Sequence, residues 1–306
     1  MSLLEKEWYI QVPWGRMCVV AWGDCCNPPV LLCHGLADSA TSFRPLIKLM
    51  PEKFYFIGID LPGCGKSDRF PPGLMINIYD LVYAVNAVAK HFRWDAFNLV
   101  GHSLGAIIGK LYNLVYPGKL TKLIEIDPIN FYAVPPEKFP KWYKRHFVDY
   151  YEQYDKLNAP KGKGKVTTVK EAIAVLRKER GFSEDLAVEA LKRSAEPAGD
   201  GLLRYTDDMR LKYVTTPAFS AEHMKTLFGS TDTQTLIIKA ENSYKNGLYR
   251  NTGFLLDEKT YPSRNVRVRS VPGDHNVHVT WPRNVAFYMA LYLLYGAEGL
   301  SSKAKL

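Results

Sequence analysis

The sequence places a serine between two glycines, in Gly101-His102-Ser103-Leu104-Gly105. An apolar run that predicts a strand precedes this pentapeptide, and an apolar run that predicts a helix follows it. In a tight turn from a strand to a helix, the residues two positions before and two positions after the serine lie so close to other main-chain atoms that only glycine fits there. The turn would hold the Ser103 hydroxyl at a helix N-terminus, which favours negative charge. The pattern therefore predicts a nucleophile at Ser103, in preference to a chance match in a loop.

A serine hydroxyl is a poor nucleophile at neutral pH and needs a base, for which histidine is the usual residue. The segment "VRVRSVPGDHNVHVTWP" places His275 in a loop between a predicted strand and the last predicted helix. His278, three residues later, is the competing candidate. We expect His275 to be the base, because of its position in the loop, and His278 to be a packing residue.

The tetrahedral intermediate of acyl transfer needs two N–H donors for its oxyanion. The N–H of Leu104, directly after the serine, is expected to be one of them. The segment "LLCHGLADS" ends a predicted strand at His34-Gly35, and this turn predicts the N–H of Leu36 as the other donor. We expect His34, Gly35 and His102 to border the substrate, with a mainly structural role for His102.

Strands and helices alternate in two parts of the chain, as they must to bring these residues together. Predicted strands cover residues 28–35, 54–60, 97–103, 120–127, 233–240 and 266–273, and predicted helices cover 78–92, 104–116 and 284–296. A hairpin is expected over residues 7–23. Short alternating units of this kind predict an α/β fold, with a mostly parallel sheet covered by helices on both faces.

The alternation stops between Pro128 and about Asp232. Thr168 and Ser183 have the positions of helix N-caps in this stretch, and no strand is evident. We therefore predict a core domain formed by residues 1–127 and 233–306, with residues 128–232 inserted as a helical cap.

Composition excludes some classes of function. The chain has 306 residues and a formal charge of +9. Its basic residues are scattered, apart from "KGKGK" at residues 161–165, which is expected to be a solvated loop, so the charge is not typical of nucleic-acid-binding proteins. Attraction to acidic substrates such as acyl-CoA is compatible with this charge. No apolar run approaches the roughly 18 residues of a membrane span. The five cysteines show no spacing typical of a zinc site, so neither a metal nor a cofactor is expected.

Four segments together resemble one fold family. They are "HGLADSATSF", "GIDLPGCGKSD", "GHSLG" and "PGDHNVH", and they occur in the order found in α/β-hydrolase-fold proteins. Within that superfamily the chain is most similar to the animal serine hydrolase-like family, which includes the insect kraken-like proteins, through "VPWGRMCVVAWG", "GHSLG" and "PGDHNVHVTWP". The resemblance implies an α/β-hydrolase fold and a serine hydrolase of poorly defined substrate.

The resemblance leaves two locations open for the residue that orients the histidine. Many members of the superfamily place this acid in a Gly-x-x-Asp context after the penultimate strand, where this chain has Ala240 and Ser243. Asp127, at the carboxyl end of the strand before the insert, is the other known location and the favoured one. Glu241 is the second candidate, and a site without an acid is the third.

These residues predict a hydrolase of the carboxylesterase type, acting through an acyl-enzyme. Small to medium hydrophobic esters are the expected substrates, with thioesters as a variant. Aromatic residues of the insert could line an acyl pocket: Phe131, Tyr132, Trp142, Tyr143 and Phe147. Ser103 argues against epoxide hydrolases and haloalkane dehalogenases, which use a carboxylate, whereas a cofactor-free peroxidase stays open. The alternative from another class is a small-molecule receptor with little turnover.

The sequence ends in Ala304-Lys305-Leu306, a close variant of the Ser-Lys-Leu peroxisomal signal. A frayed tail is the competing interpretation of this tripeptide. We expect import into peroxisomes through the import receptor, and a cytoplasmic location if the tripeptide is not read.

Overall fold

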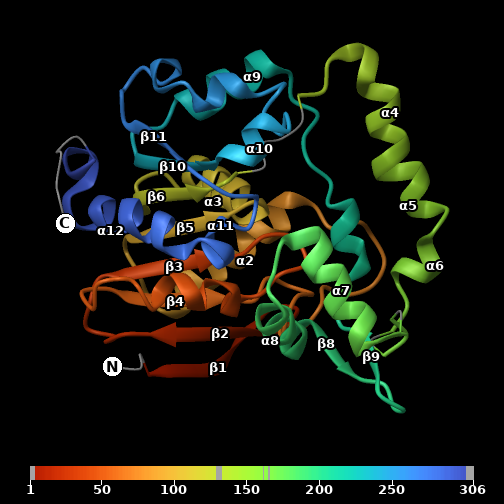
Figure 1. Cartoon of the computed structure of the whole chain (residues 1–306). Helices are drawn as coiled ribbons and strands as arrows, with labels where there is room; N and C mark the ends of the chain where they lie inside the picture. Colours follow the sequence, from red (N-terminus) through yellow and green to blue (C-terminus); the bar gives the residue numbers. More distant parts are fainter. Residues whose placement is uncertain (1–3, 129–132, 161, 165, 301–306) are drawn as a thin grey trace.

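An eight-stranded sheet is the centre of the molecule in a computed structural model that describes residues 4–128, 133–160, 162–164 and 166–300 (Figure 1). The strands lie in the order β1-β2-β4-β3-β5-β6-β10-β11. Their bounds are β1 Glu5–Val12, β2 Gly15–Trp22, β3 Pro29–Cys33, β4 Tyr55–Ile59, β5 Phe97–His102, β6 Leu120–Ile126, β10 Gln234–Ala240 and β11 Val266–Val271. From β4 to β11 all neighbours are parallel, and β2 runs antiparallel to both of its neighbours, β1 and β4. The predicted hairpin and the predicted parallel sheet are both confirmed.

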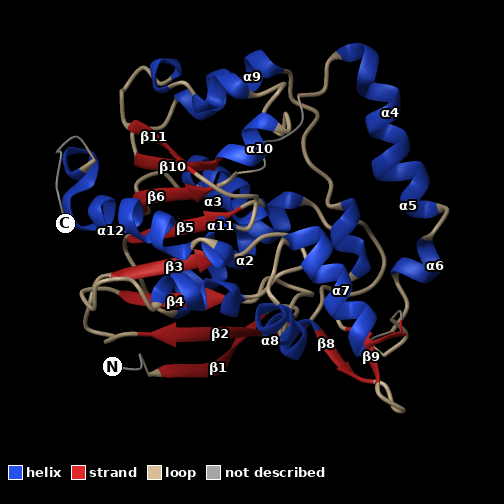
Figure 2. Ribbon diagram, viewed as in Figure 1, coloured by secondary structure: helices blue, strands red, loops and turns tan. Residues whose placement is uncertain are grey.

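Helices cover both faces of this sheet (Figure 2). One face packs against α2 (Ile78–His91), α3 (Leu104–Val115) and α9 (Ala221–Gly229), and the other against η1 (Ala40–Phe43), α1 (Arg44–Ile47), α11 (Val277–Thr280) and α12 (Pro282–Gly299). Two separate apolar cores result, because strands buried on both faces carry apolar side chains on both. Helix α2 begins where the sequence predicts: the Asn77 side chain accepts a hydrogen bond from the N–H of Tyr79, and Asp80 accepts one from the N–H of Asn77.

Most of the inserted segment lies to one side of the sheet, on the right in Figure 1, whereas α9, which is also within residues 128–232, packs against the core. Its helices are η2 (Pro136–Lys138), α4 (Phe139–Tyr143), the π-helical turn η3 (Lys144–Val148), α5 (Asp149–Tyr151), α6 (Tyr154–Leu157), α7 (Val169–Arg180), α8 (Glu184–Ser194) and η4 (Met209–Tyr213). The predicted N-caps Thr168 and Ser183 accept hydrogen bonds from the N–H groups of Glu171 and Leu186.

The expectation that this segment contains no strand is wrong. A small antiparallel sheet has the order β7-β9-β8 and is formed by β7 (Val166–Thr168), β9 (Leu202–Tyr205) and β8 (Ala195–Pro197). Each of these strands is too short for alternation of apolar and polar residues to be visible, and their pairing is set by tertiary contacts.

Short elements complete the fold after β10. They are α10 (Glu241–Lys245), η5 (Gly253–Leu256) and η6 (Glu258–Thr260). Among the helices of the described residues, none has the length and apolar character needed to cross a membrane.

Candidate active site

The turn between β5 and α3 holds Ser103 in a strained conformation, with φ 54° and ψ −114°. A β-carbon on Gly101 would lie 2.3 Å from the carbonyl oxygen of Gly105, and one on Gly105 would lie 2.0 Å from the carbonyl oxygen of Cys33. Both distances are impossible for a side chain, so the two glycines are required where the sequence analysis expected them. The N–H of Ser103 donates to the carbonyl of Ile126, which ties the turn to β6.

Three side chains from different strand ends form a hydrogen-bonded chain. His275 Nε2 lies 2.8 Å from Ser103 Oγ, and His275 Nδ1 lies 2.6 Å from Asp127 Oδ2. The carboxylate accepts the proton of Nδ1, so a neutral imidazole keeps Nε2 free to accept the hydroxyl proton of Ser103. This is the arrangement in which a serine can be activated for attack on a carbonyl carbon.

Asp127 is fully buried and is surrounded by donors. Its Oδ1 accepts hydrogen bonds from the N–H of Ala240 at 2.8 Å and the hydroxyl of Tyr249 at 2.6 Å. Its Oδ2 accepts from the Ser243 hydroxyl at 2.6 Å, in addition to His275. Burial and the nearby Asp127 carboxylate raise the pKa of Tyr249 far above its ordinary value, so Tyr249 keeps its proton and remains a donor.

The other candidate for the acid, Glu241, is in a different environment. Its half-exposed carboxylate pairs with Lys245, with an N–O distance of 3.6 Å. The geometry therefore favours Asp127 as the partner of His275. Sequence reasoning missed Ser243 and Tyr249 as donors to Asp127. The signal for Ser243 was present, because serine stands where many relatives have the acid, but nothing in the sequence pointed to Tyr249.

The loop after β3 packs against the serine turn. A β-carbon on Gly35 would lie 3.1 Å from Ser103 Cβ and 3.0 Å from His102 Nδ1. Leu36 and Leu104 line the same pocket, so two main-chain segments that could supply oxyanion donors border one space. The ring of His34 is buried: Nδ1 donates to the carbonyl of Gly35, and Nε2 accepts from the N–H of Leu61. With both ring nitrogens bonded to the main chain, the His34 side chain orders this loop and does not face the pocket.

An arginine of the insert holds the same loop from outside. Arg180, at the end of α7, donates to the carbonyls of Ala37 at 2.5 Å and Leu36 at 3.4 Å. Its own carbonyl accepts from the Asn276 side chain, next to His275. Arg180 thus bridges the loop of Leu36 and the loop of His275, a role that its position in the sequence did not indicate.

Two further histidines lie behind the serine. His102 Nε2 donates to the carbonyl of His275 at 2.9 Å, and the rings of His102 and His278 are 4.0 Å apart. Burial lowers the pKa of both rings well below the ordinary value, so both are neutral. His278 is fully buried beside Phe43, as expected for a packing residue.

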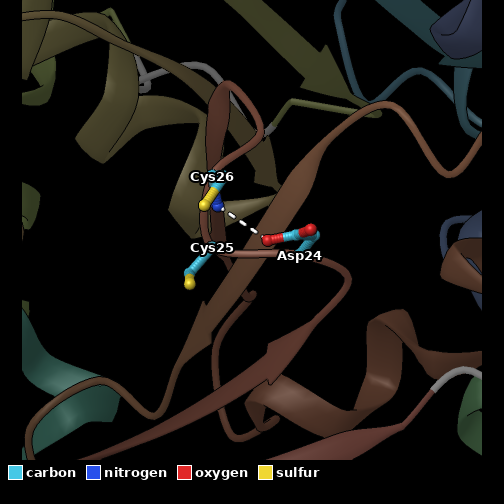
Figure 3. A group of neighbouring side chains, drawn as sticks. All are labelled: Asp24, Cys25 and Cys26. Carbon is cyan, nitrogen blue, oxygen red and sulfur yellow. Dashed lines mark hydrogen bonds between the residues drawn. The ribbon is translucent and has the colours of Figure 1, made fainter.

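Two groups of described residues bring together three atoms that could bind a metal. One is the buried group of Asp38, His102 and His278. The other is the exposed group Asp24, Cys25 and Cys26, in which Asp24 Oδ1 accepts a hydrogen bond from the N–H of Cys26 (Figure 3). This bond closes a local turn, which by itself explains why these three side chains lie together.

A pocket of about 520 Å³ opens beside the serine turn. Its floor is apolar, and its rim contains basic side chains. The lining includes Leu36, Leu104, Ile107, Ala133, Val134, Trp142, Leu211 and Val214, with Lys138, Lys141, Arg145, His146 and Lys212.

Of the aromatic residues expected in this pocket, Trp142 lines it. Tyr143 and Phe147 instead border a different hollow, on the other side of the same helical segment. Phe131 and Tyr132 lie outside the described residues.

Residues 28–196 match the family model of the α/β hydrolase fold. The chain belongs to the α/β-hydrolase fold family. Within it, this α/β hydrolase is 28% identical over 300 residues to human serine hydrolase-like protein 2, covering 95% of this chain and 94% of that protein. It is 33% identical over 158 residues to human serine hydrolase-like protein, covering 51% of this chain and 78% of that protein. The predicted resemblance to the serine hydrolase-like family is confirmed.

The fold of this α/β hydrolase is also found in solved structures. A hypothetical protein from Pseudomonas aeruginosa superposes with a TM-score of 0.81 and 23% identity, over 96% of this chain and all of that one. At this identity the likeness shows the fold alone. The comparisons and the fold together support a hydrolase.

Proposed function

We propose that this hydrolase cleaves carboxylic esters of hydrophobic acyl groups, or the corresponding thioesters, through an acyl-enzyme on Ser103. The observation that carries the proposal is the chain from Ser103 Oγ through His275 to Asp127, with distances of 2.8 and 2.6 Å. An activated serine beside an apolar pocket is suited to acyl transfer from a hydrophobic substrate.

In the first half of the proposed reaction, Ser103 Oγ attacks the substrate carbonyl carbon while His275 Nε2 takes the hydroxyl proton. The main-chain N–H groups of Leu36 and Leu104 stabilise the oxyanion. The carbon–oxygen or carbon–sulfur bond then breaks, and His275 gives its proton to the leaving alcohol or thiol. Asp127 holds the imidazole in place and stabilises its charged form.

In the second half, water attacks the acyl-enzyme and His275 accepts one of its protons. Collapse of the new intermediate releases the carboxylic acid and returns the proton to Ser103. The inserted segment acts as a lid over the pocket in this proposal, because Arg180 ties it to the loop of Leu36.

The receptor alternative rested on the altered sequence around the usual position of the acid. The hydrogen bond between His275 and Asp127 supports a complete catalytic site and therefore favours the hydrolase. Multiple turnovers of a hydrophobic ester would exclude a receptor with little turnover, whereas tight binding without turnover would favour it.

The experiment that tests the hydrolase proposal is labelling with a fluorophosphonate, followed by the mass of the intact protein. We expect one adduct on the wild type and none on Ser103→Ala. Ser230→Ala, which changes an exposed serine at the end of α9, is the matched control and should be labelled like the wild type. Folded wild-type protein that takes up no adduct would contradict the proposal.

We also propose import into peroxisomes through Ala304-Lys305-Leu306. These three residues lie outside the described residues, so this proposal rests on the sequence alone. A fluorescent protein that carries residues 297–306 should appear in peroxisomes, and the same fusion without the last three residues should not. Diffuse fluorescence from the complete fusion would refute import through this signal.

A further inference from the structure

The pocket beside Ser103 combines an apolar floor with a basic rim. Lys138, Lys141, Arg145 and Lys212 are all exposed at its mouth, and no acidic residue is part of its lining. None of the four forms an ion pair with another residue in the part of the chain that the structure describes. Their charge is therefore available to a ligand.

The spacing of three of these cations in the sequence explains why they lie on the same side of a helical segment. Lys138, Lys141 and Arg145 follow each other by three and four residues along η2, α4 and η3, which places them on one side of the helical segment. Trp142 lies on the same side and lines the pocket with them. The opposite side carries Tyr143 and Phe147, which stack on each other with ring centroids 4.9 Å apart.

The acidic residues that flank the three cations in the sequence do not line this rim. Asp149 pairs with Lys144, which does not line the pocket. Glu137 precedes Lys138 in the sequence but is absent from the lining too. Cations in a cleft with apolar walls attract an anion more strongly than the same cations on a flat surface.

From this arrangement we infer that the substrate is an anionic amphiphile: a hydrophobic acyl ester or thioester whose far end carries negative charge, such as phosphate or carboxylate. This inference rests on the proposed function, because it assigns the substrate class of the same site. The acyl chain lies on the apolar floor next to Leu36 and Leu104, and the anionic end lies among the cations at the mouth.

The negative charge could belong to the leaving group or to the far end of the acyl chain, and three thioesters distinguish these cases. The decanoyl thioester of coenzyme A carries phosphates on the leaving group. The decanoyl thioester of pantetheine has the same reacting atoms and no charge. The pantetheine thioester of decanedioic acid carries its charge on the acyl end.

Two variants with equal changes in net charge provide the comparison. Lys138→Gln/Lys141→Gln/Arg145→Gln removes three cations from the pocket. Lys156→Gln/Lys170→Gln/Lys225→Gln removes three exposed lysines that do not line it. Because neither set forms an ion pair with the residues that the structure describes, both variants should fold, which thermal unfolding will verify.

We expect the wild type to hydrolyse at least one anionic thioester with a kcat/KM about 10- to 50-fold above that of the neutral one. The pocket variant should lose most of this advantage, because its KM should rise more for the anionic thioester than for the neutral one. The control variant should keep the advantage, and high salt should reduce it in the wild type. Equal losses on neutral and anionic thioesters, or no loss at all, would overturn the inference.

A binding experiment separates this inference from the proposed function. A thioether analogue of decanoyl-CoA, which cannot be hydrolysed, should bind to Ser103→Ala more tightly than the thioether of pantetheine, and the pocket substitutions should abolish the difference. If Ser103→Ala prefers the charged thioether but the wild type hydrolyses none of the thioesters, the hydrolase proposal is wrong and the inference of an anionic ligand is kept. If the wild type hydrolyses the thioesters but neither assay shows a preference for charge, the hydrolase proposal is kept and the inference of an anionic ligand is wrong.

Discussion

The core side and the insert side of the site are held in different ways. On the core side, Asp127 accepts four hydrogen bonds, and His275 is bonded through both ring nitrogens. On the insert side, the cations at the pocket mouth are exposed and have no ion-pair partner among the described residues. A site that must move protons needs fixed partners, whereas a site that selects a ligand needs unpaired groups.

Two arginines of the insert, Arg193 and Arg180, join the two sides. Arg193, in α8, contacts Asp60 at the end of β4 through Nη2, with a distance of 2.8 Å, and both side chains are almost completely buried. Arg180 holds the main chain of Leu36 and Ala37. The predictions below separate reactivity, which we assign to the core, from attachment and selection, which we assign to the insert.

The largest effect is expected from Asp127→Asn. Without the carboxylate, His275 loses the partner that fixes its tautomer, and kcat should fall by about ten-thousand-fold. Glu241→Gln, which changes the alternative acid, should alter kcat less than twofold or so. Ester or thioester hydrolysis under single-turnover conditions measures both, and a larger loss in Glu241→Gln than in Asp127→Asn would show that the core assignment is wrong.

The position of Ser243 allows a sharper version of that test. Asp127→Asn/Ser243→Asp moves the carboxylate to the site that many relatives use, next to the original one. We expect at least about tenfold recovery of kcat over Asp127→Asn alone, because Ser243 Oγ already lies 2.6 Å from Asp127 Oδ2. Recovery accompanied by normal thermal unfolding would show that the role belongs to the carboxylate and not to the strand that carries it.

The attachment of the insert should matter most for stability. Arg193→Met leaves Asp60 buried without its charged partner and should reduce the free energy of unfolding by about 3–5 kcal/mol. Arg177→Met removes an exposed pair with Glu184, whose N–O distance is 3.9 Å, and should cost less than about 1 kcal/mol. Urea denaturation compares the two, and equal costs would mean that the buried pair does not attach the insert to the core.

A smaller effect on activity is expected from Arg180→Met. The loop of Leu36 would lose a charged donor, so the oxyanion should be less well stabilised and kcat should fall by about tenfold, with KM changed little. Arg180→Lys should restore part of kcat, because a cation still reaches the carbonyls. A change confined to KM would show that Arg180 contributes to binding and does not position the loop.

The smallest effect concerns Asp207, which lies in the insert. Burial raises the pKa of its carboxyl to about 7, although the nearby Arg180 acts in the opposite direction. The folded protein therefore keeps a proton that the unfolded chain has released, so this group lowers stability as the pH rises towards 7. Asp207→Asn should raise Tm by about 2–4 °C at pH 8 and by less at pH 5.

Asp155→Asn, an exposed carboxylate elsewhere in the insert, is the control for that experiment. It should follow the wild-type Tm at both pH values. A Tm gain for Asp207→Asn that is larger at pH 5 than at pH 8 would contradict the buried-proton explanation.

The sequence by itself determined the fold family and the tight turn that holds Ser103. Buried strands such as 28–35 and 120–127 can be recognised from a few residues, because a strand that is buried on both faces needs a continuous apolar run. The glycines around Ser103 were predictable for a similar reason: the steric need is local, and only one residue type satisfies it. His275 followed from the order of the elements, since the loop after the last strand lies at the same sheet edge as the serine turn.

Only the tertiary structure decided which acid meets His275 and what surrounds it. Asp127 is separated from Ser243, Tyr249 and His275 by more than a hundred residues, and their hydrogen bonds exist because β6, β10 and β11 are neighbours in the sheet. The same holds for the contacts of Arg180 and Arg193, for the small sheet β7-β9-β8, and for the pocket formed by residues from the loop after β3, from α3 and from the insert. Patterns in the sequence report steric and burial needs of nearby residues, whereas partners across the fold depend on where the sheet brings distant segments together.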